Sequence, residues 1–107
     1  MKILFKNQET LISVPVYEFE IVEDEIILYQ NETEKILVMN VTASFIWRFI
    51  NEHIIDSNMI SDLEITRAVM KEYDIRDNFY NQILEDVRHI LDILFTENIF
   101  KIENANI

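Results

Sequence analysis

The sequence has no glycine, no cysteine and a single proline, and each shortage excludes a class of site. Without cysteine there is no disulfide framework, thiolate chemistry or zinc-finger spacing. Without glycine there is no phosphate-binding loop or dinucleotide fingerprint. Positions with positive φ must also be taken by residues with side chains, most often asparagine. We therefore expect Asn31 to turn a hairpin and Asn98 to end the last helix in a left-handed conformation.

Basic residues and long apolar runs are also scarce. Nine lysines and arginines stand against 20 acids, for a net charge of −11. This argues against a nucleic-acid partner, because phosphate binding needs a basic face. No apolar run reaches the roughly 18 to 20 residues that span a bilayer, and the N-terminus lacks the pattern of a signal peptide. We expect a cytoplasmic protein with no membrane partner.

The acids are concentrated in one segment. Residues 18–34 contain no lysine or arginine and seven acids: Glu18, Glu20, Glu23, Asp24, Glu25, Glu32 and Glu34. They form either a solvated surface that keeps the protein soluble or an acidic rim that favours a partly basic partner.

The remaining composition, 50% apolar and 27% charged, is typical of one globular domain. Hydrophobic periodicity predicts an α+β fold, with a three-stranded antiparallel sheet followed by three helices. The predicted strands are 17–22, 25–30 and 35–39, and the predicted helices are 41–51, 61–73 and 79–97. Residues 1–16 are expected to be an extended lead-in, 17–102 the domain, and 103–107 a tail.

The third strand raises a question about its surroundings. Residues 36–39 are apolar in succession, whereas a strand with one wet face should alternate. Either the protein covers both faces, or an edge or face is left for a guest. Periodicity fits both readings. Asn40 follows directly and is expected to cap the first helix.

The third helix carries two apolar stripes whose combined arc is about 160° wide at about 100° per residue, more than a surface helix needs. The first stripe is Phe79, Ile83, Val87, Ile90 and Leu94; the second is Tyr80, Leu84, Leu91 and Phe95. The excess width indicates either burial by the other two helices or a groove lined by the second stripe.

Catalytic and metal chemistry is not indicated. His53 and His89 lie on different predicted elements with no second ligand at metal spacing, so we expect no metal or other cofactor. Asp86, beside the apolar arc of the third helix, is either an ordinary rim residue or a group that pairs with a guest. Neighbouring carboxylates carry no weight in so acidic a chain, and we expect no enzyme activity.

Three stretches resemble the PqqD-like family. In chain order they are Met39-Asn40-Val41-Thr42-Ala43, the helix-ending Tyr73, and the Asp86-Val87 pair followed by an apolar run. The resemblance covers about residues 17–102. Two positions depart from the family pattern, which has Leu in place of Met39 and Gly near Asn98. Both replacements are physically conservative.

The resemblance implies a winged helix-turn-helix fold that has lost DNA binding. Members hold the leader of a ribosomally made precursor peptide and present it to a modifying enzyme, such as a radical SAM enzyme or a leader peptidase. The leader adds as a strand to the edge of the third strand and fills a groove beside the third helix. The expected peptide-binding residues are Lys35, Ile36, Leu37, Val38, Met39, Tyr80, Leu84, Val87 and Leu91.

Two other readings stay open at this point. A winged-helix transcription regulator would read DNA with its third helix, but there Glu85 and Asp92 oppose Arg88. A structural subunit could bind a protein partner at the same edge, and sequence does not separate it from the peptide-binding reading. Monomer and homodimer are equally compatible with the sequence.

Overall fold

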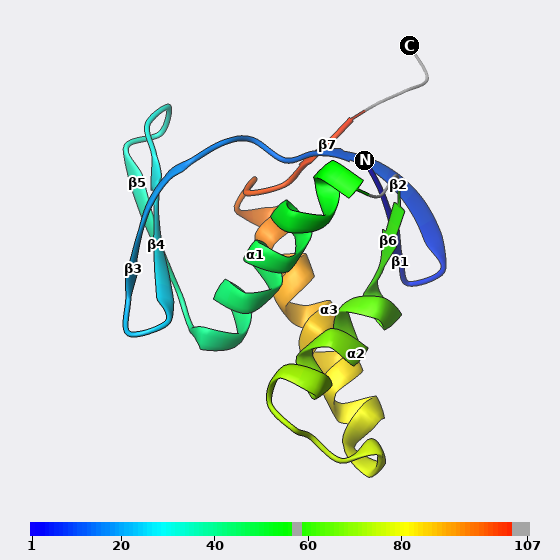
Figure 1. Ribbon diagram of the computed structural model, residues 1–107. Helices are drawn as coiled ribbons and strands as arrows, with labels where there is room; N and C mark the ends of the chain where they lie inside the picture. The colour runs from blue at the N-terminus through cyan, green and yellow to red at the C-terminus, as the bar shows by residue number, and fades with distance from the viewer. Residues whose placement is uncertain (57–58, 104–107) are drawn as a thin grey trace.

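The computed structural model describes residues 1–56 and 59–103, which form an α+β fold with two separate sheets. Figure 1 shows the helices in the middle, a three-stranded sheet on one side and the second sheet on the other. The predicted α+β class is confirmed, and the second sheet was not predicted. Among the described residues, no helix is long and apolar enough to cross a membrane.

The three-stranded sheet is the predicted antiparallel meander. Its strands are β3 (Glu18–Val22), β4 (Glu25–Gln30) and β5 (Lys35–Met39), with β4 in the centre. The two-residue turn from β3 to β4 has positive φ at Glu23 and Asp24, which is the type I′ pattern without glycine. Asn31 lies in the next turn, as predicted, but Glu34 takes the left-handed conformation there.

Residues 1–16 are corrected from a lead-in outside the domain to a hairpin within it. Strands β1 (Lys2–Phe5) and β2 (Gln8–Ser13) are joined by a two-residue turn with positive φ. Strand β6 (Met59–Ser61) pairs parallel to β1, and β7 (Lys101–Ile102) pairs antiparallel to β2. Ile3 and Ile12 are fully buried in the common core. The hairpin is therefore part of the packed domain.

The helices are α1 (Val41–Asp56), α2 (Asp62–Glu72) and α3 (Tyr80–Thr96), the last preceded by a 3₁₀ turn, η1 (Asp77–Phe79). The predicted cap of α1 is confirmed, since Asn40 Oδ1 accepts from the Ala43 N–H at 2.8 Å. Ser61 Oγ accepts from the Glu64 N–H at 3.0 Å and caps α2. Helix α1 is longer than predicted, because its described part continues past residue 51 to Asp56.

The end of α3 confirms the expectation for Asn98, whose φ is 58°. The Asn98 N–H donates to the Phe95 C=O at 3.0 Å, and the Ile99 N–H donates to the Leu94 C=O at 2.8 Å. These are the two hydrogen bonds of a Schellman motif. Ile99 and Leu94 are both buried, as the apolar contact of that motif requires. The chain is thus turned from α3 toward β7.

Candidate functional site

Among the described residues, strand β5 pairs only with β4, so it is an open edge of the three-stranded sheet. Its side chains alternate in burial although they do not alternate in polarity. Ile36 and Val38 are 63% and 61% exposed, whereas Leu37 is half-buried and Met39 is buried. The reading in which the protein covers both faces is therefore excluded for the described residues. One apolar face of β5 packs inward, and the other lies open.

The hydrogen-bond phase of the sheet shows which backbone groups of β5 are free. In an antiparallel pair, the N–H and C=O of one residue point to the same neighbour, and those of the next point the other way. Ser44 Oγ accepts from the Ile26 N–H (2.8 Å) and donates to the Met39 C=O (3.1 Å). The backbone C=O of Met39 therefore points toward β4. By alternation, Ile36 and Val38 direct their N–H and C=O groups to the open edge.

The structure corrects the expected contribution of α3 to this edge. Val87 and Leu91 are fully buried and belong to the core. Tyr80 and Leu84 are half-buried, but Tyr80 lies under the guanidinium of Arg67 on α2, 4.3 Å from its ring centroid. Of the four α3 residues predicted to line a groove, two are core residues and one packs on α2.

The second stripe of α3 meets the N-terminal hairpin and α2. Phe95 packs on Phe5 of β1, with 5.9 Å between ring centroids. Arg88 Nε donates to the buried carboxylate of Asp62 at 2.8 Å, and that carboxylate also accepts from the Lys6 N–H at 3.0 Å. This buried cluster ties α3, α2 and the hairpin together. The extra width of the apolar arc is thus explained by burial, partly against a hairpin that was not predicted.

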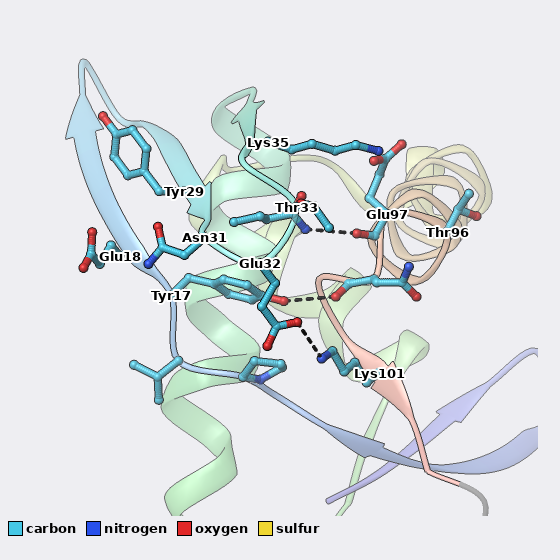
Figure 2. Close-up of a pocket in the computed structure, with 14 residues that line it drawn as sticks. Tyr17, Glu18, Tyr29, Asn31, Glu32, Thr33, Lys35, Thr96, Glu97 and Lys101 are labelled. Atoms are coloured by element: carbon cyan, nitrogen blue, oxygen red, sulfur yellow. Dashed lines mark hydrogen bonds and ion pairs between the residues drawn. The ribbon is translucent and has the colours of Figure 1, made fainter.

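A cavity of about 470 Å³ opens at the start of β5, between the turn at 31–34 and the C-terminal end of α3. Figure 2 shows Lys35, the first residue of β5, extending toward Glu97 across this space. The other lining residues include Tyr17, Gln30, Glu32, Asn98 and Lys101. Fourteen residues line the cavity, and Lys35 is the one among them that was predicted as a site residue. The cavity joins segments that are distant in sequence, so no local pattern could have indicated it.

Tyr17 joins two of the segments that line this cavity. Its hydroxyl donates to the Asn98 C=O at 3.0 Å, which links the start of β3 to the end of α3. Burial, followed by the nearby carboxylate of Glu32, raises the pKa of Tyr17 above its ordinary value. Glu32 itself lies 3.9 Å from the ammonium of Lys101. The left-handed Asn98 and the turn at 31–34 therefore meet at one point.

A smaller cleft of about 230 Å³ lies at the opposite edge of the sheet, where β3 meets α1. Phe19 packs edge-on against Trp47 there, with 5.2 Å between ring centroids. Trp47 Nε1 is buried and has no hydrogen-bond partner among the described residues. Among the described residues, strand β3 pairs only with β4, so it is an open edge like β5, but it is flanked by aromatic rings.

The histidines do not form a metal site. His53 Nδ1 lies 2.8 Å from the Phe49 C=O within α1, and His89 is exposed on α3. In residues 1–56 and 59–103, no three histidine, cysteine or acidic side chains are grouped so that they could hold a metal ion. Asp86 is exposed on α3.

Comparison with protein-family models gives one assignment. Residues 25–99 match the model described as coenzyme PQQ synthesis protein D (PqqD). The matched segment begins with β4 and ends just after α3, so the N-terminal hairpin lies outside it. Comparisons with curated proteins and with solved structures gave no match.

Proposed function

Because this chain belongs to the PqqD family, the precursor-peptide recognition elements of ribosomally made peptides, we propose that it binds the leader of such a peptide along β5. The leader adds as a further strand of the three-stranded sheet. The chain then presents the peptide to a modifying enzyme, such as a radical SAM enzyme, and has no catalytic role. We place this activity in the cytoplasm.

The observation that carries this proposal is the open edge at Ile36 and Val38. Their N–H and C=O groups point away from β4. The two residues are two positions apart, which is the spacing at which an added strand would present its own N–H and C=O groups to them. Strand addition uses such groups for affinity and side-chain pockets for specificity. An apolar open edge without a guest would invite aggregation, which gives the edge a reason to be occupied.

The groove beside this edge is assigned to a different side of α3 from the one predicted. Phe95 and Arg88 face the hairpin and α2, so at about 100° per residue the opposite side carries Asp86, Ile90 and Ile93. Ile90 is half-buried and Ile93 is 42% exposed. We propose that apolar leader side chains reach this side, where Asp86 is placed to pair with a basic leader residue.

Charge and contacts oppose the reading as a DNA-binding regulator. In a winged-helix arrangement α3 would enter the groove of DNA, but Arg88 is held by the Asp62 carboxylate at 2.8 Å. Glu85 and His89 are exposed beside it, and the net charge is −11. Counterion release needs a basic surface, and α3 does not offer one.

Proline substitution on the two open edges tests the proposal. Val38→Pro removes a donor that the protein does not use, so the fold should survive, since proline is tolerated on an edge strand whose N–H faces solvent. Peptide affinity should fall about tenfold, because one guest hydrogen bond is lost and the strand is distorted. Ile21→Pro is the matched control, since by the same alternation its N–H points to the open edge of β3. Equal affinity of folded Val38→Pro and the parent protein would refute the assignment to β5.

A further inference from the structure

The outer face of the three-stranded sheet carries regular rows of apolar and acidic side chains. Strand addition at the edge of β5 leaves this face uncovered. Register places Ile36 of β5 beside Tyr29 of β4 and Glu18 of β3, in one row across the sheet. Cross-strand neighbours point to the same face. Figure 2 shows Tyr29 and Glu18 pointing away from the side where Lys35 reaches Glu97. The exposure of Ile36 identifies this side as the face turned to solvent.

The next row repeats the pattern. Val38 of β5 lies beside Ile27 of β4, and Ile27 lies beside Glu20 of β3. Both rows therefore run apolar, apolar, acidic from β5 to β3. Strands are about 4.8 Å apart, so the acidic column lies about 10 Å from the column of Ile36 and Val38. Val22, 50% exposed, extends the apolar area near the turn. No lysine or arginine occurs in residues 18–34.

We propose that this outer face docks a folded protein partner whose apolar patch is bordered on one side by lysine or arginine. The apolar columns of β4 and β5 take the patch, and Glu18 and Glu20 pair with the basic border. The partner is the modifying enzyme, an identification that rests on the proposed function. The enzyme would then sit against the face of β5 while the peptide occupies its edge, so both surfaces share one strand.

A second copy of this chain does not fit the same face. Face-to-face packing about a two-fold axis along the strands would lay Glu18 and Glu20 of one copy over the apolar column of the other. An axis across the strands would lay these acids over the same acids of the second copy. Burying carboxylates without a positive partner is costly, and this face supplies no base. Two chains of charge −11 also repel each other. Complementary charge therefore points to a different, partly basic protein.

The test separates the face from the edge by substituting the strands that are not part of the edge. Ile27→Thr keeps a β-branched residue in the central strand, and Glu20→Lys reverses one charge of the acidic column. Matched controls are Ile102→Thr on the exposed strand β7 and Glu85→Lys at an exposed position of α3 outside the side assigned to the peptide. The probes are a purified peptide-modifying enzyme and its precursor peptide, of the classes that the proposed function names. Each dissociation constant is measured separately, after melting curves confirm folding.

The combination of Ile27→Thr and Glu20→Lys should weaken enzyme binding by about tenfold or more and leave peptide affinity unchanged, and neither control should alter either constant. Unchanged enzyme affinity in the folded double variant would overturn the docking face. A parallel loss of peptide affinity would assign the face to the peptide, and loss of a parent homodimer in sedimentation would assign it to a second copy. If the parent protein binds the enzyme but not the peptide, the proposed function fails. The enzyme affinity of the double variant then still tests the docking face.

Discussion

Asn98 occupies a position where glycine would cost least. With φ at 58°, Asn98→Gly should leave the free energy of unfolding unchanged or raise it slightly, because glycine has no Cβ to strain. Asn98→Ala should lower that free energy by about 1 kcal/mol, because alanine tolerates the left-handed region poorly. Asn31→Ala is the control, since Asn31 is not among the residues with positive φ. Urea unfolding followed by the fluorescence of Trp47, the only tryptophan, measures all three.

Tyr17 gives a prediction for alkaline pH. Burial and the nearby Glu32 raise its pKa in the folded protein above the value near 10 of the unfolded chain. The folded state therefore holds the proton more tightly, so this contribution to stability is complete below about pH 10 and is lost as pH rises through the folded pKa.

Tyr17→Phe should accordingly have two opposite effects. At pH 7 it should cost about 1 kcal/mol, because the hydrogen bond to the Asn98 C=O is lost. Above pH 10 its stability should fall less steeply than that of the parent protein. Tyr29 and Tyr73, whose pKa values are also raised, leave part of the slope in place. The free energy of unfolding of Tyr17→Phe and of the parent protein, measured from pH 8 to pH 11, tests this. The same decrease with pH in both proteins above pH 10 would contradict it.

At the scale of elements, local patterns were informative where one element meets solvent on a defined side. Strands β4 and β5 have the predicted bounds, and Asn40 caps α1 as expected, because alternation and capping chemistry depend on neighbours in sequence. The hairpin of β1 and β2 was missed since its turn, Lys6-Asn7, lacks the glycine that usually indicates a type I′ turn.

Which partner packs on which side of α3 could not be predicted for a related reason. A wide apolar arc indicates that several partners pack on a helix, but it does not say which partner meets which stripe. The partner of Phe95 is Phe5, 90 positions earlier in the chain, in a hairpin that sequence reasoning had left unpaired. The open edge of β5 was therefore predictable, whereas the burial of Val87 and Leu91 in the core was not.

The burial of Leu91 leads to a direct test of this correction. Leu91→Ala should lower the free energy of unfolding by about 2 to 5 kcal/mol, as expected for a fully buried leucine. The peptide affinity of the folded fraction should not change. Ile93→Ala, on the exposed side of the same helix, should cost far less stability and should weaken peptide binding. Thermal melts and peptide titrations of both variants would reveal the reverse pattern if the groove were lined by the second stripe.

At the scale of the whole molecule, the N-terminal hairpin is expected to be a structural requirement. Ile3 of β1 is fully buried in the core, so Ile3→Ala should cost about 2 to 5 kcal/mol. Ile36→Ala removes the same atoms from an exposed position in another strand and should cost under about 1 kcal/mol. Urea denaturation compares the two. Equal costs would mean that the hairpin does not share the core.

The same molecule has two open edges in one sheet, and the proposed function chooses between them. Amide hydrogen exchange, followed by NMR with and without the leader of the precursor peptide, measures that choice directly. The account predicts that the peptide slows exchange at Ile36 and Val38 of β5, whose N–H groups point to the edge, and leaves Phe19 and Ile21 of β3 unchanged. Protection at Phe19 and Ile21 instead, or at neither edge under saturating peptide, would contradict it.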